Sequence, residues 1–306
     1  MRPAPTSLMI LACLVGGGNA HGEPSIDVSP PRPLGKGTVV RLRLESTTTT
    51  QDDLLIHFHG AVDTIRQAME RAGTTATVIV VNQPGLSGAY AAPFREDTDL
   101  FARLLAEPGR FDAVDGDDEP PPRWRRVSLS CFSAGYGAVR EILKDPASFD
   151  RVDAIVAADS IYAGLDETPL DKAARRVDPR DMAGFLAFAR AAAEAKKVFV
   201  VTHSAQPTPY ASTTETADDL LASVGLERSS LVVAADAPFP QVSRAGRGGF
   251  AVLGFTGASG PAHLFHLRSI DRWWQVADRL AAAGHEPRSG PGKIDDDPRP
   301  PVSPTA

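Results

Sequence analysis

The chain has 306 residues, of which 42% are hydrophobic and 23% are charged, enough to build one substantial core. Its formal net charge of -6 argues against a nucleic-acid-binding or anionic-membrane surface. The interior of the sequence has no run of eighteen apolar residues, so no integral membrane span is expected.

The N-terminus predicts export. Arg2 precedes a short apolar stretch, and small residues lead up to Ala20, which gives a signal peptide over residues 1–20. The sequence ILAC, which ends at Cys13, also fits a lipidation site, and a lipid-anchored protein is the alternative. A secreted or periplasmic protein is expected, with Cys131 as its only unmodified cysteine and hence no intramolecular disulfide.

After a linker predicted over residues 21–36, strand-like apolar runs alternate with helical patterns. The predicted strands are 37–46, 53–60, 75–83, 126–133, 151–160, 198–204 and 248–257. The predicted helices are 61–73, 98–109, 134–145, 180–197, 215–226 and 263–283. This alternation requires crossover connections. We therefore expect an α/β fold with a mostly parallel central sheet of about seven or eight strands and helices on both faces.

Two further segments complete the predicted domain organisation. The apolar run 231–236 is predicted as the hairpin partner of the last strand. Residues 284–306 are rich in proline and charge, without an apolar period, and are predicted as a disordered tail. The remaining residues, 37–283, are predicted to form one α/β domain.

Chemically capable residues stand at the predicted carboxyl ends of the strands, where reactive groups gather in parallel sheets. Ser133 ends one strand and opens a glycine-rich helix, Asp159 ends the next strand, and His263 follows the last strand. A serine hydroxyl becomes a nucleophile only when a base takes its proton, and a sharp strand-to-helix turn exposes it to that base. The N–H of Ala134, at the start of the helix, would face a developing oxyanion.

At these residues the chain resembles the α/β-hydrolase superfamily, in its serine esterase and lipase form, over roughly residues 37–283. Ser133, Asp159 and His263 follow the chain order of the superfamily's nucleophile, acid and base. The Gly-x-Ser-x-Gly turn of the superfamily is present with Cys131 in place of the first glycine, at a crowded position that needs a small side chain.

The resemblance also implies an oxyanion hole. The sequence HFHGA, residues 57–61, is similar to the His-Gly motif of lipases and esterases. Its likeness implies that the N–H of Gly60 or Ala61 would bind the oxyanion together with the N–H of Ala134. His59 would then hold the shape of the loop.

Several residues remain as alternatives for these roles. His266 is the alternative base, although its neighbours resemble a packing stripe. Most α/β-hydrolases carry the acid one strand later than Asp159, where this chain has no carboxylate before Glu215, so Glu215 and Asp218 are the alternative acids. The histidines lack metal-ligand spacing, and neither a metal nor another cofactor is expected.

The sequence thus predicts an exported serine hydrolase that cleaves a carboxylic ester through an acyl-enzyme. The expected partner is a small-molecule or lipid-like ester, and nucleic acid is not expected. A catalytically silent binding protein of the same fold is one alternative, and a peptidase or amidase on the same scaffold is the other. Residues 161–179 are long enough for only a small lid.

Overall fold

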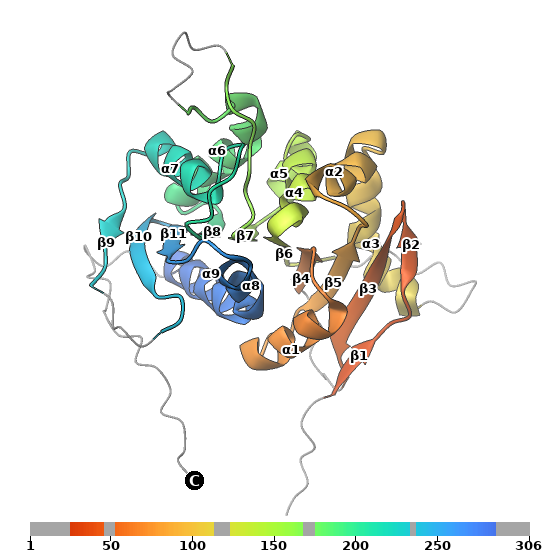
Figure 1. The fold of residues 1–306 in the computed structure, drawn as a ribbon. Coiled ribbons are helices and arrows are strands. Elements are labelled where there is room, and N and C mark those ends of the chain that lie inside the picture. Colours follow the sequence, from red (N-terminus) through yellow and green to blue (C-terminus); the bar gives the residue numbers. More distant parts are fainter. Residues whose placement is uncertain (1–24, 46–52, 113–122, 168–174, 233–236, 286–306) are drawn as a thin grey trace, which may run out of the picture.

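The computed structural model describes residues 25–45, 53–112, 123–167, 175–232 and 237–285. Within them the chain forms a single mixed sheet of eleven strands with helices on both faces (Figure 1). The expected signal peptide, including Cys13, and residues 286–306 of the expected tail lie outside the described residues.

Apolar and β-branched runs form most of the strands. In chain order the strands are β1 (Ile26–Val28), β2 (Arg32–Leu34), β3 (Gly37–Leu44), β4 (Asp53–Phe58), β5 (Thr77–Asn82), β6 (Arg126–Phe132), β7 (Ala154–Ala158), β8 (Val198–His203), β9 (Ser229–Ser230), β10 (Gln241–Arg247) and β11 (Phe250–Phe255). Their spatial order is β1-β3-β5-β4-β6-β7-β8-β11-β10-β9, and β2 pairs with β3. The six strands from β5 to β11 in this order run parallel, and the pairs outside them are antiparallel.

Most of the helices connect the parallel strands, and the last two follow β11. The helices are α1 (Val62–Ala72), α2 (Ser87–Glu96), α3 (Leu100–Asp112), η1 (Ser133–Gly135, a 3₁₀ turn), α4 (Tyr136–Ile142), α5 (Pro146–Arg151), α6 (Pro179–Ala193), α7 (Thr213–Ser223), α8 (Gly260–Arg268) and α9 (Ile270–His285). None of the helices in these described ranges is long and apolar enough to cross a membrane.

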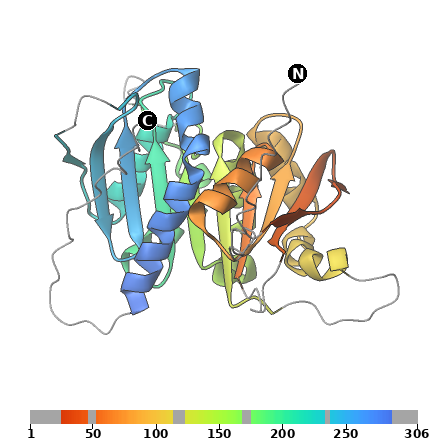
Figure 2. The ribbon, with the colours of Figure 1, turned by 90° about the horizontal axis from the view of Figure 1, so that it is seen from below.

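The central strands are buried on both faces because successive side chains enter two different cores. Along β5, Ile79 and Val81 join the core beneath α2, α3, α4 and α6, whereas Val78 and Val80 join the core beneath α1 and α9. In Figure 2 the orange α1 and the blue α9 lie side by side across this second face. The predicted fold class is confirmed.

The sheet has more strands than the seven or eight predicted. Residues 25–36, expected as part of a linker, instead carry β1 and β2, which pair with β3. In the described chain β10 pairs with β11 as a hairpin, and most of the run 231–236 that was expected in this place lies outside the described residues. The last helix continues to His285, two residues beyond the predicted end of the domain.

Candidate active site

Residues with unusual backbone conformations gather at one edge of the sheet. Of the four non-glycine residues with positive φ in the described chain, three directly follow β4, β6 and β7: His59 at 73°, Ser133 at 48° and Asp159 at 44°. The left-handed region is costly for a residue with a side chain and persists only where the surrounding structure holds it. The carboxyl edge of the sheet therefore stores local strain beside the predicted catalytic residues.

Ser133 stands on a sharp turn between β6 and the helix that follows. It opens η1, which continues into α4, and its side chain lies partly exposed in a cavity. The turn fits only because two glycines lack side chains. A Cβ on Gly135 would lie 2.3 Å from the Phe58 carbonyl oxygen, and one on Gly137 would lie 2.1 Å from the Ser87 carbonyl oxygen. These approaches hold the start of the helix against β4 and α2.

Cys131, the departure from the superfamily's glycine, is accommodated by Ser160. The Cys131 side chain is fully buried, and its Sγ lies 3.2 Å from the Ser160 hydroxyl. The same hydroxyl lies 2.9 Å from the Ser133 carbonyl oxygen, so Ser160 joins the turn after β7 to the turn that bears Ser133. Burial raises the pKa of the Cys131 thiol to about 12 against the smaller effect of the Ser160 hydrogen bond, so the thiol stays protonated.

Asp159 and His263 form a hydrogen-bonded pair. The His263 Nδ1 lies 2.7 Å from Asp159 Oδ2, although the two residues are 104 positions apart in the chain. An ionised carboxylate only accepts hydrogen bonds, so His263 Nδ1 donates and, in the neutral ring, Nε2 keeps its lone pair. This is the tautomer that a general base at Ser133 requires.

Three further donors hold the Asp159 carboxylate. Oδ1 accepts from the Ser204 N–H at 2.9 Å and from the Thr213 hydroxyl at 2.6 Å, and Oδ2 accepts from the Ser204 hydroxyl at 2.8 Å. Burial opposes ionisation, but the hydrogen bond from His263, the nearby His266 and the bonds from Thr213 and Ser204 lower the pKa of Asp159 to about 2. Asp159 is thus an anion at neutral pH and fixes the His263 ring.

An aromatic ring also positions His263. The Phe132 ring centroid lies 4.5 Å from that of His263. The His59 ring stacks on Phe132, with the centroids 5.8 Å apart and an interplanar angle of 15°. His59 Nδ1 in turn lies 2.7 Å from the Tyr90 hydroxyl. His59 therefore supports the loop and the ring packing behind His263, in agreement with the structural role expected for it.

Ser133 and His263 line one cavity of about 600 Å³ at the carboxyl edge. Ala134 and three tyrosines line it as well. Within the described residues no hydrogen bond joins the Ser133 hydroxyl to the His263 ring. Hydrogen bonds between a nucleophile and its base are often long or misaligned before substrate binds, and a shared cavity is the arrangement from which they form.

The expected oxyanion donors differ in what their N–H groups contact. Ala134 is the second residue of its helical turn, so its N–H has no partner within the helix, and Ala134 lines the cavity. The Gly60 N–H is already donated to Asn82 Oδ1 at 3.0 Å, and Asn82 Nδ2 donates to the Gly60 carbonyl at 2.8 Å. Gly60 is therefore held by Asn82, and the expectation that its N–H is a free donor is wrong.

Ala61 remains as the second candidate donor. It is the N-cap residue of α1, and its N–H has no acceptor among the residues that the structure describes. Its carbonyl accepts from Ile65 N at 3.1 Å, as the first hydrogen bond of the helix. The Asn82 side chain bonds both the N–H and the carbonyl of Gly60, and these bonds fix the position of the Ala61 N–H that follows.

The alternative base and the alternative acids are engaged elsewhere. His266 is fully buried, with its Nδ1 2.6 Å from the Thr202 hydroxyl and its ring against aromatic side chains of α8, α9 and β11. Glu215 caps α7 through Ser212 and pairs with Arg175, and Asp218 pairs with Arg228. Of these candidates, only Asp159 contacts His263.

Two further histidines, His57 and His203, are held by contacts away from the cavity. His57 is fully buried with Nδ1 2.9 Å from the Ser130 hydroxyl, and burial lowers its pKa to about 3. His203 is held between the Thr214 hydroxyl and the Arg228 guanidinium. Among the described residues, no group of three or more histidine, cysteine or carboxylate side chains is placed to hold a metal ion.

Sequence reasoning missed the residues that support the pair. Ser204 and Thr213, which hold Asp159, and Phe132, which packs on His263, carried no motif. Ser204 follows β8 directly, so its place at a strand end was the one available signal. Short polar side chains are common at such ends, and only the folded geometry distinguishes a ligand of Asp159 from a turn residue.

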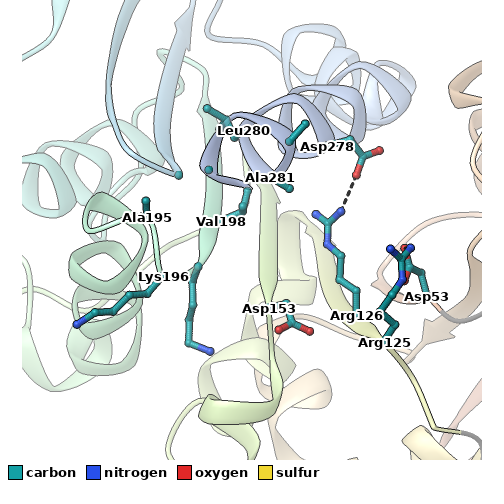
Figure 3. A pocket seen from close by; sticks show the side chains of 14 residues that line it. Asp53, Arg125, Arg126, Asp153, Ala195, Lys196, Val198, Asp278, Leu280 and Ala281 are labelled. Carbon is teal, nitrogen blue, oxygen red and sulfur yellow. Dashed lines mark hydrogen bonds and ion pairs between the residues drawn. The ribbon is translucent and has the colours of Figure 1, made fainter. Parts of the chain in front are cut away.

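A second cavity of about 580 Å³ opens at the opposite, amino edge of the sheet (Figure 3). Charged side chains line it, and they pair with one another: Arg126 with Asp278 at 2.9 Å and Arg125 with Asp53 at 2.9 Å. The first pair joins the amino end of β6 to α9, and the second joins the amino end of β4 to the residue that precedes β6. The predicted catalytic residues do not line this cavity.

Comparison with known proteins gives structural likeness at low sequence identity. No family model matches the chain, and no curated protein is significantly similar in sequence. Three solved structures illustrate the likeness. A CIB-like hydrolase of Thermoplasma acidophilum is 11% identical, over 84% of this chain and 99% of that chain, with a TM-score of 0.43. A poly(3-hydroxybutyrate) depolymerase of Bordetella parapertussis is 16% identical, over 85% and 95%, with a TM-score of 0.43.

The third is an alpha-beta serine hydrolase homologue from Coxiella burnetii. It is 13% identical, over 83% of this chain and 97% of that chain, with a TM-score of 0.41. In the chain itself, six parallel strands connected by helices carry a serine on a strand-to-helix turn, followed in sequence by an aspartate and a histidine that bond to each other. The chain has the α/β-hydrolase fold.

Proposed function

We propose that the protein is an exported serine hydrolase that cleaves a carboxylic ester through an acyl-enzyme, with Ser133 as nucleophile, His263 as base and Asp159 as acid. One observation carries the proposal. The Asp159-bound His263 ring lines the same cavity as Ser133, which is held in a left-handed conformation on a strand-to-helix turn.

The reaction follows from this arrangement. Ser133 Oγ attacks the ester carbonyl carbon while His263 Nε2 takes the hydroxyl proton, and Asp159 stabilises the imidazolium that forms. The N–H groups of Ala134 and Ala61 are the proposed donors to the tetrahedral oxyanion, a role worth about 10²- to 10³-fold in rate per donor. His263 then gives the proton to the leaving alcohol, and the acyl group remains on Ser133.

The second half of the reaction uses the same groups. His263 takes a proton from a water molecule, the resulting hydroxide attacks the acyl-enzyme, and the acid leaves as Ser133 recovers its proton. Every proton passes between water, substrate, Ser133 and His263, so the chain's own side chains suffice and no cofactor enters the proposal. A peptidase or amidase would share these steps and differ in the leaving group.

A fluorophosphonate probe tests the proposal. We expect the folded protein to be labelled at Ser133 and to hydrolyse short-chain esters, and Ser133→Ala and His263→Ala to abolish both. Ser130→Ala is the matched control, since Ser130 lies in β6, the strand that leads to Ser133, but bonds His57 and Trp274 in the interior. A folded wild-type protein that is neither labelled nor active would support a silent binding protein instead.

Export is the second part of the proposal, supported by the signal-peptide pattern of residues 1–20. Expression of the full chain in a bacterium, followed by fractionation and N-terminal sequencing of the mature protein, tests it. We expect a mature N-terminus at residue 21. A chain retained in the cytoplasm at full length would contradict export, and a lipid on Cys13 would identify the lipoprotein alternative.

A further inference from the structure

The cavity that contains Ser133 has a wall of three tyrosines. Tyr136 begins α4, Tyr162 follows β7, and Tyr210 precedes α7, so three separate connections of the sheet supply the rings. The ring centroids of Tyr136 and Tyr162 are 5.7 Å apart, and those of Tyr162 and Tyr210 are 5.6 Å apart. The chain has four tyrosines in all, so their convergence on one cavity is a specific feature.

Contacts with neighbouring side chains hold the inner part of this wall. The Tyr136 hydroxyl lies 3.2 Å from the Ser87 hydroxyl, and the Arg140 guanidinium lies over its ring at 5.5 Å from the centroid. Tyr162 meets Tyr210 edge to face at an interplanar angle of 84°. Such pairs present a ring face and a ring edge to the cavity, which suits a further aromatic ring more than a saturated one.

The outer part of the wall is open. Tyr210 is 48% exposed, and Leu86, which also lines the cavity, is 82% exposed. A ring of the substrate that packed between them would cover apolar surface that is now in water.

The charges around the cavity favour a neutral ring. Asp181 lines the cavity, but its carboxylate is paired with Arg140 at 2.9 Å and accepts from the Gly164 N–H at 2.8 Å. No lysine or arginine is among the lining residues that the structure describes. An anionic ring would find no lysine or arginine among the described lining residues, and a cationic ring would find Asp181 already paired with Arg140.

From this geometry we infer that the substrate is a neutral ester with an aromatic ring, and that Tyr162 and Tyr210 determine this specificity. The inference rests on the proposed function, since it places the ring of the substrate beside the ester bond that Ser133 would cleave.

Matched ester pairs test the inference. Ethyl phenylacetate and ethyl cyclohexylacetate place the ring on the acyl side, and benzyl acetate and cyclohexylmethyl acetate place it on the alcohol side. In both pairs the ring is separated from the ester by a methylene group, so the intrinsic reactivity is similar. We expect the aromatic member of at least one pair to have a kcat/KM about 3- to 10-fold higher, the preference that one aromatic contact supplies.

Substitutions of Tyr162 and Tyr210 test whether these tyrosines cause the preference for the aromatic ester. Tyr162→Leu and Tyr210→Leu should bring the aromatic-to-saturated ratio of that pair close to one, whereas Tyr162→Phe should keep it. The ratio is taken within each variant, so a general loss of activity cancels. Phe239→Leu is the matched control, because Phe239 packs on Phe265 and does not line the cavity. Since Tyr210 is half-exposed, its variant remains informative if Tyr162→Leu fails to fold.

The outcomes separate the two proposals. A ratio near one for both pairs in a wild-type protein that hydrolyses ethyl acetate would overturn the aromatic specificity and leave the hydrolase intact. A ratio unchanged by both leucine variants would also overturn the role of the wall. A protein that hydrolyses no ester and takes up no fluorophosphonate would overturn both proposals.

Discussion

The surroundings of Asp159 fix both the charge and the position of its carboxylate. Four hydrogen bonds from His263, Thr213 and Ser204 converge on its carboxylate, and its backbone is held at a φ of 44°. An ordinary capping aspartate needs one or two such bonds. The set of donors therefore fits a carboxylate that must stay ionised and immobile beside an imidazole.

Replacement of Asp159 by asparagine tests this role. The amide keeps the size of the side chain but can donate to His263 Nδ1, which places the proton on the wrong ring nitrogen. We expect kcat for ester hydrolysis to fall by about 10³- to 10⁴-fold with the fold retained. Steady-state kinetics and a thermal unfolding curve measure both quantities. Full turnover by Asp159→Asn would place the acid elsewhere, and Glu215→Gln would be the next variant.

The sequence indicated the candidate residues of the site but not the side chains that hold them. Ser133, Asp159 and His263 were predicted from their places at strand ends, a rule that follows from the topology of a parallel sheet, and from the chain order that the resemblance implies. Their catalytic roles stay predictions. Gly60 was assigned a free N–H because a motif does not reveal that Asn82, at the end of the neighbouring strand, already accepts from it. Hydrogen-bond partners from other strands are fixed only by the folded register.

At the scale of elements, the turn between β6 and α4 depends on close backbone approach. Alanine at Gly135 or Gly137 would bring a Cβ within 2.1–2.3 Å of a backbone oxygen, which requires β4 or α2 to move. We expect the free energy of unfolding of each variant to fall by about 1–3 kcal/mol or more, the usual cost of overpacking, and hydrolytic activity to be lost as well.

Gly88→Ala is the matched control for these glycines. Gly88 lies in α2, and a Cβ there would meet nothing within 4 Å, so we expect this variant to be neutral or slightly stabilised. Urea unfolding and ester hydrolysis of the three variants provide the comparison. Wild-type stability in Gly135→Ala would show that the turn is looser than the structure indicates.

Elements with weak apolar patterns were the ones missed. β10 has the sequence QVSRAGR at one antiparallel end of the sheet and no fully buried residue, so it lacks the alternation that marks a half-buried strand. β1 and β2 are three residues long each and exist through pairing with β3. The long central strands were predicted because burial on both faces demands continuous apolar runs, which a sequence shows directly.

At the scale of the whole molecule, buried histidines make stability depend on pH. Burial, the largest cause for each, lowers the pKa of His57 to about 3 and of His203 and His266 to about 4. In the unfolded chain these groups have pKa values near 6.5. Between pH 6.5 and 4 the unfolded state therefore binds more protons, and stability falls as the pH falls through this range.

His266→Gln should weaken this dependence. For His266 the linked loss between pH 6.5 and 4 is roughly 3 kcal/mol, opposed by Asp159 and increased by His263. We expect the free energy of unfolding of the variant to fall less steeply over this range than that of the wild type. Urea unfolding at pH 7 and pH 4.5 measures the difference. Equal slopes in the two proteins would mean that His266 is not held neutral by the fold.

The left-handed backbone at Ser133 sets stability against function at a single position. Glycine adopts a φ of 48° without the penalty that serine incurs, so glycine there would relax the turn and remove the nucleophile together. Selection for heat resistance alone would favour glycine at residue 133, whereas selection for hydrolysis would retain serine. Stabilising changes for this protein are therefore to be sought away from the carboxyl edge of the sheet, in the strands and helices that hold that edge in place.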